Sequence, residues 1–509
     1  MISYLVNRFS IVKQLKGRLA ETPLAYRLAK GAFWSLAGGI GLRALTFAVS
    51  IIVARTIGKE GYGELGIVQS TLGMFGTLAG FGLGTAATKY IAEYRLKDPA
   101  KADRIASFSM LFAFFCSGVM SVACALMSPW LASTTLNRSE IAPLLLAGAL
   151  LLFISTMGGV FSAILAGFEA FKPIAKINIW YGITALLITY PLVYFYKVEG
   201  AIASLTISAA VSLILSAIAT RKEYRKYNIS SKFDKAAFQE WPVIWKYALP
   251  ATIIGLLGAP VAWVTNAILV NQPGGYGEMG LFTAANQWRM AVIYLLPMLM
   301  SAMLPVMSET HGRSDKTDFK RIVSLNFRIA WLVALPITVI IISLGVPAAA
   351  LFGKQYLDAA PIITILMISV FLHIINLSVA SAIAGSGRIW IGTLMNLGWA
   401  VVMIISSLIF IPRLGGQGLA ISYALSYTVH GICTMAYAER KIAKSSVSSQ
   451  WQLMAYSIIV LLASMFISVR VANKHIYQVA LIFLSLVPLF KNVRSAFSQR
   501  VMVNIGSER

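Results

Sequence analysis

Apolar runs of about 20 residues recur along the whole sequence, and they constrain the fold more than any other feature. A helix of this length crosses the hydrocarbon core of a bilayer and satisfies its own backbone hydrogen bonds there. Of the 509 residues, 58% are apolar and only 12% are charged, which is unlike a soluble enzyme. The sequence therefore predicts an all-α polytopic membrane protein. Its fourteen predicted spans are 31–57, 62–87, 105–127, 141–167, 177–195, 200–219, 244–269, 279–307, 323–351, 359–384, 390–411, 416–438, 451–469 and 475–490.

The basic residues are distributed unevenly between the two sides of these spans. The net charge is +24, and 32 of the 43 lysines and arginines fall in segments on the same side as the termini. The seven loops on the other side carry only 7 of them. Since cytoplasmic loops retain lysine and arginine, this bias predicts both termini in the cytoplasm. It also accounts for the charge without any nucleic acid, and it predicts attraction of anionic lipids.

The predicted organisation is two lobes of six spans with short additions. We expect a basic N-terminal segment at 1–30, a first lobe at 31–220, a charged cytoplasmic linker at 221–243, a second lobe at 244–438, two further spans at 439–490 and a cytoplasmic tail at 491–509. The outer loops are too short to form a domain.

Two hexapeptides indicate an internal repeat. Gly-Tyr-Gly-Glu-Leu-Gly at 61–66 recurs as Gly-Tyr-Gly-Glu-Met-Gly at 275–280. Two shorter matches follow in the same order and at nearly the same offset, Ala166-Gly167 with Ala384-Gly385 and Asn178 with Asn396. We therefore expect a six-helix unit used twice, with two C-terminal helices appended. Transporters built from such repeats bind their substrates between the lobes, near the membrane midplane.

The sequence offers little to catalysis. It contains no Walker loop, no HExxH and no Gly-x-Ser-x-Gly motif. The three cysteines lie in apolar runs without metal-ligand spacing, and the outer loops carry no pair of carboxylates. We expect no cofactor, no metal and no enzymatic activity.

Arginines inside the predicted spans are the sharpest functional signal. Arg43 lies near the centre of 31–57, and Arg289 lies ten residues into 279–307, after Asn286-Gln287-Trp288. Intramembrane charge is costly, and it usually faces a polar cavity or a partner. The alternatives are structural: Arg43 paired with a carboxylate such as Glu64, and Arg289 in a hydrogen-bonded cluster.

Glu64 and His373 are the candidates for ion coupling. Glu64 is the acid most clearly inside a span, and His373 lies in the middle of 359–384. The alternative for Glu64 is a helix cap, because its repeat counterpart Glu278 occupies the same place. The alternative for His373 is a histidine with a purely structural role in the core.

Several motifs resemble a known family. Lys30–Trp34 leads into Arg43, and Gly61–Gly63, Gly82–Ala86 and Lys89–Glu93 follow. Over about residues 28–440 the chain resembles the Wzx-type polysaccharide flippases of the multidrug/oligosaccharidyl-lipid/polysaccharide (MOP) exporter superfamily. The resemblance implies two six-helix lobes in a V around a central lumen. It also implies a bacterial inner-membrane protein that flips an undecaprenyl-diphosphate-linked oligosaccharide by alternating access, often coupled to an ion gradient.

From the resemblance we expect a flippase for a repeat unit of O-antigen, lipopolysaccharide, capsule or exopolysaccharide. The diphosphate would meet Arg43 and Arg289, because arginine holds phosphate in a bidentate manner. The sugars would meet four polar or aromatic side chains: Asn266, Asn286, Gln287 and Trp288.

Two alternatives stay open. A cation-coupled multidrug exporter on the same fold is disfavoured, because the deep charges are arginines rather than acids. A membrane glycosyltransferase or polymerase is disfavoured by the short outer loops. We expect the chain to act as a monomer, with a polysaccharide polymerase or chain-length machinery as candidate partners.

Overall fold

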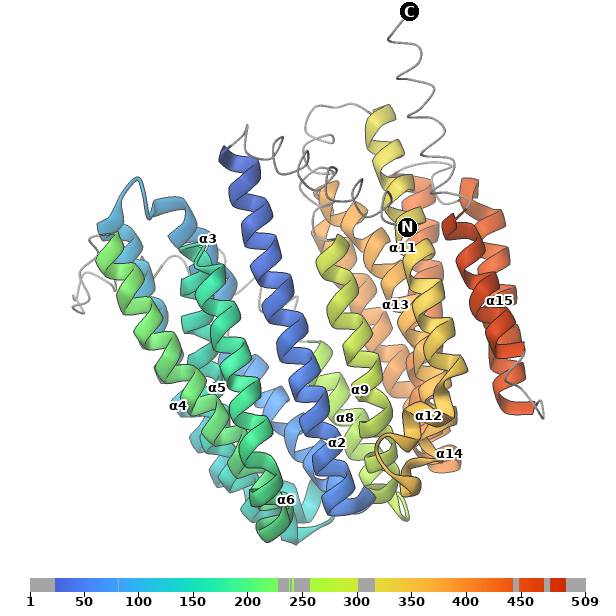
Figure 1. Ribbon diagram of the computed structural model, residues 1–509, viewed down its shortest axis with the longest axis horizontal. Helices are drawn as coiled ribbons and strands as arrows, with labels where there is room; N and C mark the ends of the chain where they lie inside the picture. The colour runs from blue at the N-terminus through green and yellow to red at the C-terminus, as the bar shows by residue number, and fades with distance from the viewer. Residues whose placement is uncertain are drawn as a thin grey trace, which may run out of the picture. The chain divides into compact units, whose positions relative to one another are not determined.

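The computed structural model describes residues 23–490 except 81, 228–237, 239, 242–256, 301–315, 443–447 and 471–476, and every regular element in the described residues is helical (Figure 1). The predicted all-α fold is therefore confirmed. The basic segment up to residue 22, most of the linker at 221–243 and the tail at 491–509 lie outside the described residues.

Each of the fourteen predicted spans overlaps a helix within the described residues. Three helices are about twice as long as a bilayer requires: α2 (Pro23–Gly80), α6 (Phe171–Lys226) and α14 (Ile389–Lys441). Each contains one non-helical residue near its middle and so carries two spans; these residues are Gly58, Lys197 and Gly415. The other described helices are α3 (Leu83–Tyr94), α4 (Pro99–Trp130), α5 (Ala142–Gly167), α8 (Gly258–Val270), α9 (Gly275–Met300), α11 (Lys316–Ser343), α12 (Gly345–Ala350), α13 (Ala359–Gly385), α15 (Trp451–Arg470) and Tyr477–Phe490.

The span predicted over 62–87 is interrupted. Helix α2 ends at Gly80, and α3 begins at Leu83. Gly82 between them has φ 60°, in the left-handed region that glycine adopts without a steric penalty. A hydropathy pattern cannot reveal this break, because both helices are apolar there.

The chain divides into two compact units. The first unit comprises 1–49, 75–128 and 143–255, and the second comprises 50–74, 129–142 and 256–509. In the first unit, α3, α4, α5 and α6 share one apolar core, which includes Ile91, Phe108, Ile164 and Tyr224.

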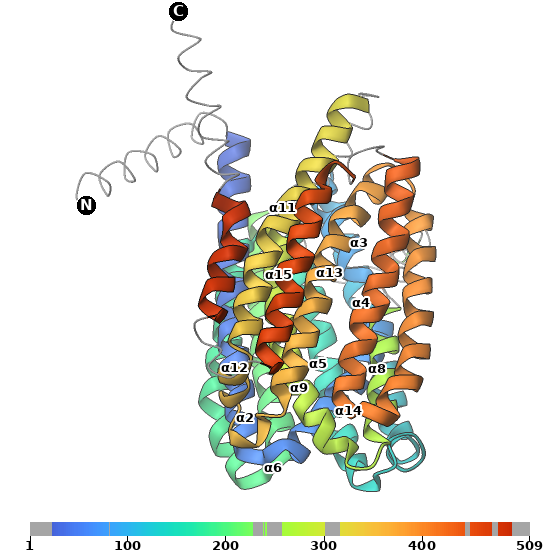
Figure 2. The same cartoon turned by 90° about the vertical axis from the view of Figure 1, so that its right-hand side faces the viewer.

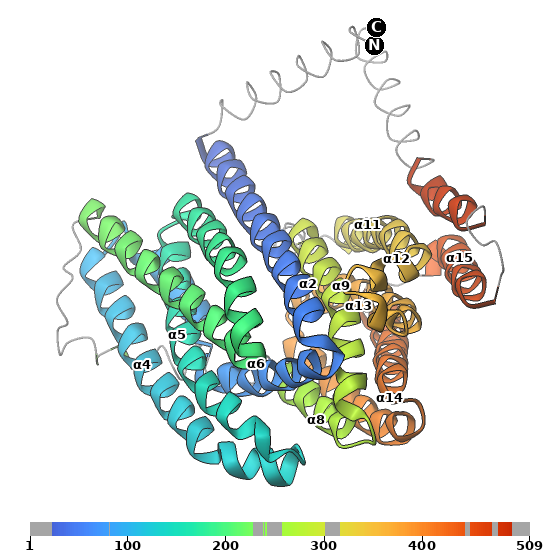
Figure 3. The same ribbon diagram turned by 60° about the horizontal axis from the view of Figure 1, so that its bottom comes forward.

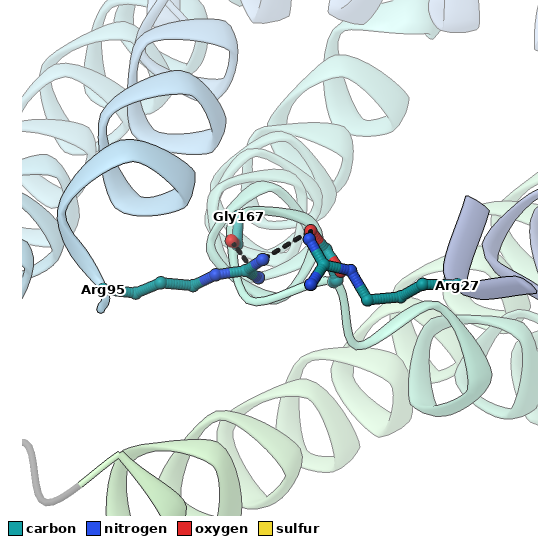
Figure 4. A network of polar contacts seen from close by, with 4 residues as sticks. Arg27, Arg95 and Gly167 are labelled. Atoms are coloured by element: carbon teal, nitrogen blue, oxygen red, sulfur yellow. Dashed lines mark hydrogen bonds and ion pairs between the residues drawn. The ribbon is translucent and has the colours of Figure 1, made fainter. Parts of the chain in front are cut away.

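An ionic network joins three helix ends in the first unit. Arg95, which is buried, donates from Nη1 to the carbonyl oxygen of Gly167 at 2.9 Å and pairs with Glu169. Arg27 near the start of α2 pairs with the same carboxylate, with Nε 2.9 Å from Oε2 (Figure 4). The shared acid neutralises part of two positive charges and links α2, α3 and the loop after α5.

In the second unit, α13 is the central helix. It packs against α9, α11 and α14 (Figure 2). Side chains are buried along most of its length. Helix α15 packs against α11, and α8 packs against α9 and α14 (Figure 3). The second unit also includes residues 50–74 of α2, so its packing combines segments that are far apart in sequence.

The backbone supports the internal repeat. The kinks at Lys197 and Gly415 have nearly the same dihedral angles, φ 49° and ψ −125° against φ 54° and ψ −130°. They are separated along the chain by the same interval as Asn178 and its counterpart Asn396. The same interval also separates the first residues of α6 and α14. The two halves therefore share features of backbone geometry as well as sequence.

Candidate functional site

A polar cavity of about 480 Å³ lies within the second unit. Its walls come from residues 66–73 of α2 and from α8, α9 and α14. Four of the six predicted substrate-binding residues line it: Asn266, Asn286, Gln287 and Arg289. Among the lining residues of this cavity none is acidic, so its formal charge comes from Arg289 alone.

Arg289 is held between an amide and a ring. Its side chain is 7% exposed, and its Nε donates to Oδ1 of Asn286 at 2.7 Å. Its guanidinium carbon lies 4.6 Å from the ring centroid of Tyr423, in a cation–π contact. These contacts orient the guanidinium without neutralising its positive charge.

The amides in the cavity retain hydrogen-bonding capacity. Asn266 donates from Nδ2 to the hydroxyl of Ser70 at 2.9 Å, while its Oδ1 is buried and accepts no hydrogen bond from the described residues. The hydroxyl of Thr283 is also buried and forms no hydrogen bond with the described residues. Leaving such a group unsatisfied costs about 1–3 kcal/mol, which a bound hydroxyl or water would recover. The cavity is therefore built to accept hydrogen-bonding ligands.

Aromatic side chains form another part of the cavity wall. The rings of Phe282 and Tyr423 stack with centroids 6.1 Å apart, and Trp399 lies 5.5 Å from Tyr427. These aromatic residues were missed by the sequence prediction. Tyr423 and Tyr427 are four residues apart on α14, and this spacing places both rings on one helix face.

The structure places the other predicted substrate-binding residues elsewhere. Trp288 does not line the cavity, and its indole Nε1 donates to the carbonyl oxygen of Ala348 at 3.4 Å. Arg43 belongs to the first unit, where its side chain is half-buried. Arg43 is therefore not among the residues that line the cavity around Arg289.

The two candidates for ion coupling, Glu64 and His373, each contact a specific side chain. Glu64 pairs through Oε1 with Nη2 of Arg138 at 2.9 Å, rather than with Arg43. His373 does not line the cavity, but its ring lies 4.7 Å from the ring of Tyr427, which does. Within the described residues, no three His, Cys, Asp or Glu side chains are grouped so as to hold a metal ion.

Glu278, the repeat counterpart of Glu64, has a defined structural contact. Its Oε2 accepts a hydrogen bond from the backbone N–H of Gly416 at 2.9 Å, directly after the kink in α14. The two repeated acids therefore have different partners, an arginine in one case and a helix kink in the other.

Comparisons with known proteins identify similar sequences. A family model described as polysaccharide biosynthesis protein matches residues 28–311. The EPS I polysaccharide export inner membrane protein EpsE of Ralstonia nicotianae is 21% identical over 401 residues, which cover 77% of this chain and 88% of that protein.

Solved structures of the MOP superfamily share the fold. The lipid II flippase MurJ in an inward closed conformation matches with a TM-score of 0.69 at 14% identity, over 91% of this chain and 99% of that one. An inward-facing multidrug resistance transporter of the MATE family matches with a TM-score of 0.65 at 17% identity, over 83% of this chain and 99% of that one. The predicted MOP-type fold is therefore confirmed.

Proposed function

The chain belongs to the polysaccharide biosynthesis protein family, and from this premise we propose that it flips an undecaprenyl-diphosphate-linked oligosaccharide across the bacterial inner membrane. It is a membrane transporter of the MOP superfamily rather than an enzyme. The name of EpsE refers to polysaccharide export and that of MurJ to flipping of lipid II, and the two names taken together support a cargo that combines a glycan with a lipid.

The observation that carries this proposal is the charge of the cavity in the second unit. Arg289 is buried there, and no carboxylate among the lining residues neutralises it. A diphosphate supplies the missing negative charge, and a guanidinium can bind it with two parallel hydrogen bonds. The same charge repels cationic drugs, so the cavity disfavours the multidrug-exporter alternative.

The remaining lining residues suit the sugars of the cargo. A sugar ring has an apolar face that packs on aromatic side chains, and its hydroxyls both donate and accept hydrogen bonds. The rings of Tyr423, Tyr427 and Trp399 offer such faces, and Oδ1 of Asn266 offers a buried acceptor. In this proposal Arg43, in the first unit, makes a separate contact with the diphosphate.

The first experiment is a gene deletion followed by lipid extraction. We expect the surface polysaccharide to disappear, while a complete repeat unit on undecaprenyl diphosphate accumulates at the cytoplasmic face. Normal polysaccharide together with increased drug sensitivity would contradict the proposal and favour the multidrug exporter.

Substitutions then test the diphosphate contact. Arg289→Ala should abolish polysaccharide export, and Arg289→Lys should restore only part of it, because lysine lacks the planar fork of donors. Arg413→Ala is the matched control, since Arg413 lies on α14 with an exposed side chain. Arg43→Ala, made separately, measures the contribution of the first unit. Full export by the Arg43→Ala, Arg289→Ala double variant, at normal membrane levels, would refute the assigned diphosphate contact.

A further inference from the structure

A second cavity, in the first unit, lies between the two arms of α6. It has a volume of about 330 Å³. Lys172 and Lys176 line it from the beginning of the helix, and Lys222 and Glu223 line it from the end. The cavity is therefore at the end of this hairpin that the charge bias assigns to the cytoplasm.

The positive charge in this cavity is only partly compensated. Lys176 and Lys222 are exposed, and within the described residues neither forms an ion pair. Glu223 has Lys226 as its ion-pair partner, 3.3 Å away. Lys172 lies over the ring of Trp34, 5.5 Å from its centroid, and keeps its charge. An anion bound here would meet lysines from both arms of the hairpin.

An exposed apolar stripe leads away from the lysines along each arm. On the first arm, Trp180 is 55% exposed and Leu187, seven residues on, is 70% exposed. On the second arm, Ile218 and Ile214 are exposed at the helical spacing that continues from Lys222. Trp180 and Ile218 line the cavity itself, so the cationic end and the apolar stripe are continuous.

We propose that this cavity binds the headgroup of an anionic glycerophospholipid, whose acyl chains lie along the stripe. Basic pockets between membrane-spanning helices on the cytoplasmic side suit lipid phosphates. Lysine acts as a point charge and suits a single phosphodiester, whereas a diphosphate favours the fork of arginine. A free phosphate would gain nothing from the apolar stripe.

Lipid binding to the purified full-length chain tests the proposal. Native mass spectrometry in detergent would compare phosphatidylglycerol with phosphatidylcholine. We expect the chain to retain phosphatidylglycerol in preference, and Lys176→Gln with Lys222→Gln to weaken that retention about 30-fold. Lys176→Arg with Lys222→Arg should retain it, because both charges remain.

The matched control removes two exposed lysines of the same unit outside the cavity, by Lys89→Gln and Lys97→Gln. It should leave retention unchanged. Equal retention of the two phospholipids, or equal losses in the control and the cavity variant, would overturn the proposal. Displacement of phosphatidylglycerol by inorganic phosphate, or by undecaprenyl phosphate at equimolar amounts, would overturn it too, since the site would then select a free anion or the carrier lipid.

Discussion

Arg289 carries a positive charge in a place where charge is costly. Insertion experiments give a free-energy cost of about 2.5–3.5 kcal/mol for an arginine at the centre of a membrane helix. The neighbours of Arg289 are an amide oxygen and an aromatic ring, and both are weaker partners than a carboxylate. The guanidinium of Arg289 therefore has no counter-ion among these neighbours. Its cost is explained if the transported cargo supplies the negative charge.

The cost of this cation leads to a prediction that separates stability from function. Arg289→Met should raise the free energy of unfolding of the empty protein by about 1 kcal/mol, because a buried charge is replaced by an apolar chain of similar volume. The same change should abolish export. Thermal unfolding of the purified protein without inorganic diphosphate measures the stability of the empty protein, and unfolding with diphosphate measures binding of the anion. Diphosphate should stabilise only the protein with Arg289. Equal stabilisation of the Arg289→Met variant would contradict the role of Arg289.

Glu64 belongs to a polar cluster in the second unit. Its carboxylate is 16% exposed and pairs with Arg138, whose guanidinium also lies 3.3 Å from Glu140 and over the ring of Tyr276. The alternatives for Glu64 were ion coupling and a structural role, and this contact supports the structural one.

A double-mutant cycle tests the Glu64–Arg138 pair. Glu64→Gln and Arg138→Gln should each lower the free energy of unfolding by about 1 kcal/mol, and the double variant should lose less than the sum. Export should fall only as far as the protein level does. If Glu64→Gln abolishes export while stability and protein level are unchanged, Glu64 acts in ion coupling instead.

The sequence could predict part of the candidate site and not the rest. Asn266, Asn286, Gln287 and Arg289 stand out because polar residues are rare inside apolar runs. Tyr423 and its neighbours do not, because aromatic residues are common in membrane helices and only packing shows which of them face a cavity. Trp288 was predicted in the site and does not line the cavity, because adjacent residues of one helix point in different directions.

At the scale of elements, the repeated hexapeptides have a packing role. A Cβ atom on Gly63 would collide with the carbonyl oxygen of Tyr276, and one on Gly280 would collide with that of Lys59. The two copies therefore lie against each other within the second unit, at a distance that only glycine allows. Each copy therefore needs glycine where the backbone of the other segment approaches it.

This contact predicts different effects for two glycines of one hexapeptide. Gly280→Ala should lower the unfolding midpoint and the membrane level of the protein, because the new methyl group meets backbone that cannot move aside. Gly277→Ala should be neutral or slightly stabilising, since its methyl group would meet only the side chain of Lys59 at 3.6 Å. Unfolding in detergent compares the two. A Gly280→Ala protein as stable as the Gly277→Ala protein would show that the hexapeptides do not require close packing.

The helices themselves could be predicted, because a long apolar run in lipid has no other way to satisfy its backbone. The breaks at Lys197 and Gly415 could also be predicted, because both residues fall between two predicted spans. The break at Gly82 could not, since Gly82 lies inside the predicted span 62–87 and looks like any other glycine in that apolar run. The assignment of 50–74 to the second unit also lay beyond prediction, because it depends on contacts between residues far apart in sequence.

For the whole molecule, the predicted orientation follows from lysine and arginine alone. The bias of 32 to 7 is large. The orientation would be reversed only if the protein inserted against the positive-inside rule. The orientation sets the direction of transport in the first proposal, and the phospholipid proposal depends on it directly. The cargo must enter from the side where its glycan is assembled, and the lysines of α6 must face the leaflet rich in anionic lipid.

Single-cysteine labelling tests the orientation of the full chain. Cys116, Cys124 and Cys433 are first replaced by alanine, and one cysteine is then introduced at Lys97, between α3 and α4, or at Lys354, between α12 and α13. Both lysines are exposed. We expect a membrane-impermeant maleimide to label Lys354→Cys in intact spheroplasts and Lys97→Cys only after lysis, because the charge bias places these two segments on opposite sides. Labelling in the reverse pattern would put the termini outside and the lysine cavity of α6 on the outer leaflet. The phospholipid proposal would then lose its argument from the cytoplasmic surface, while the argument from Arg289 would still stand.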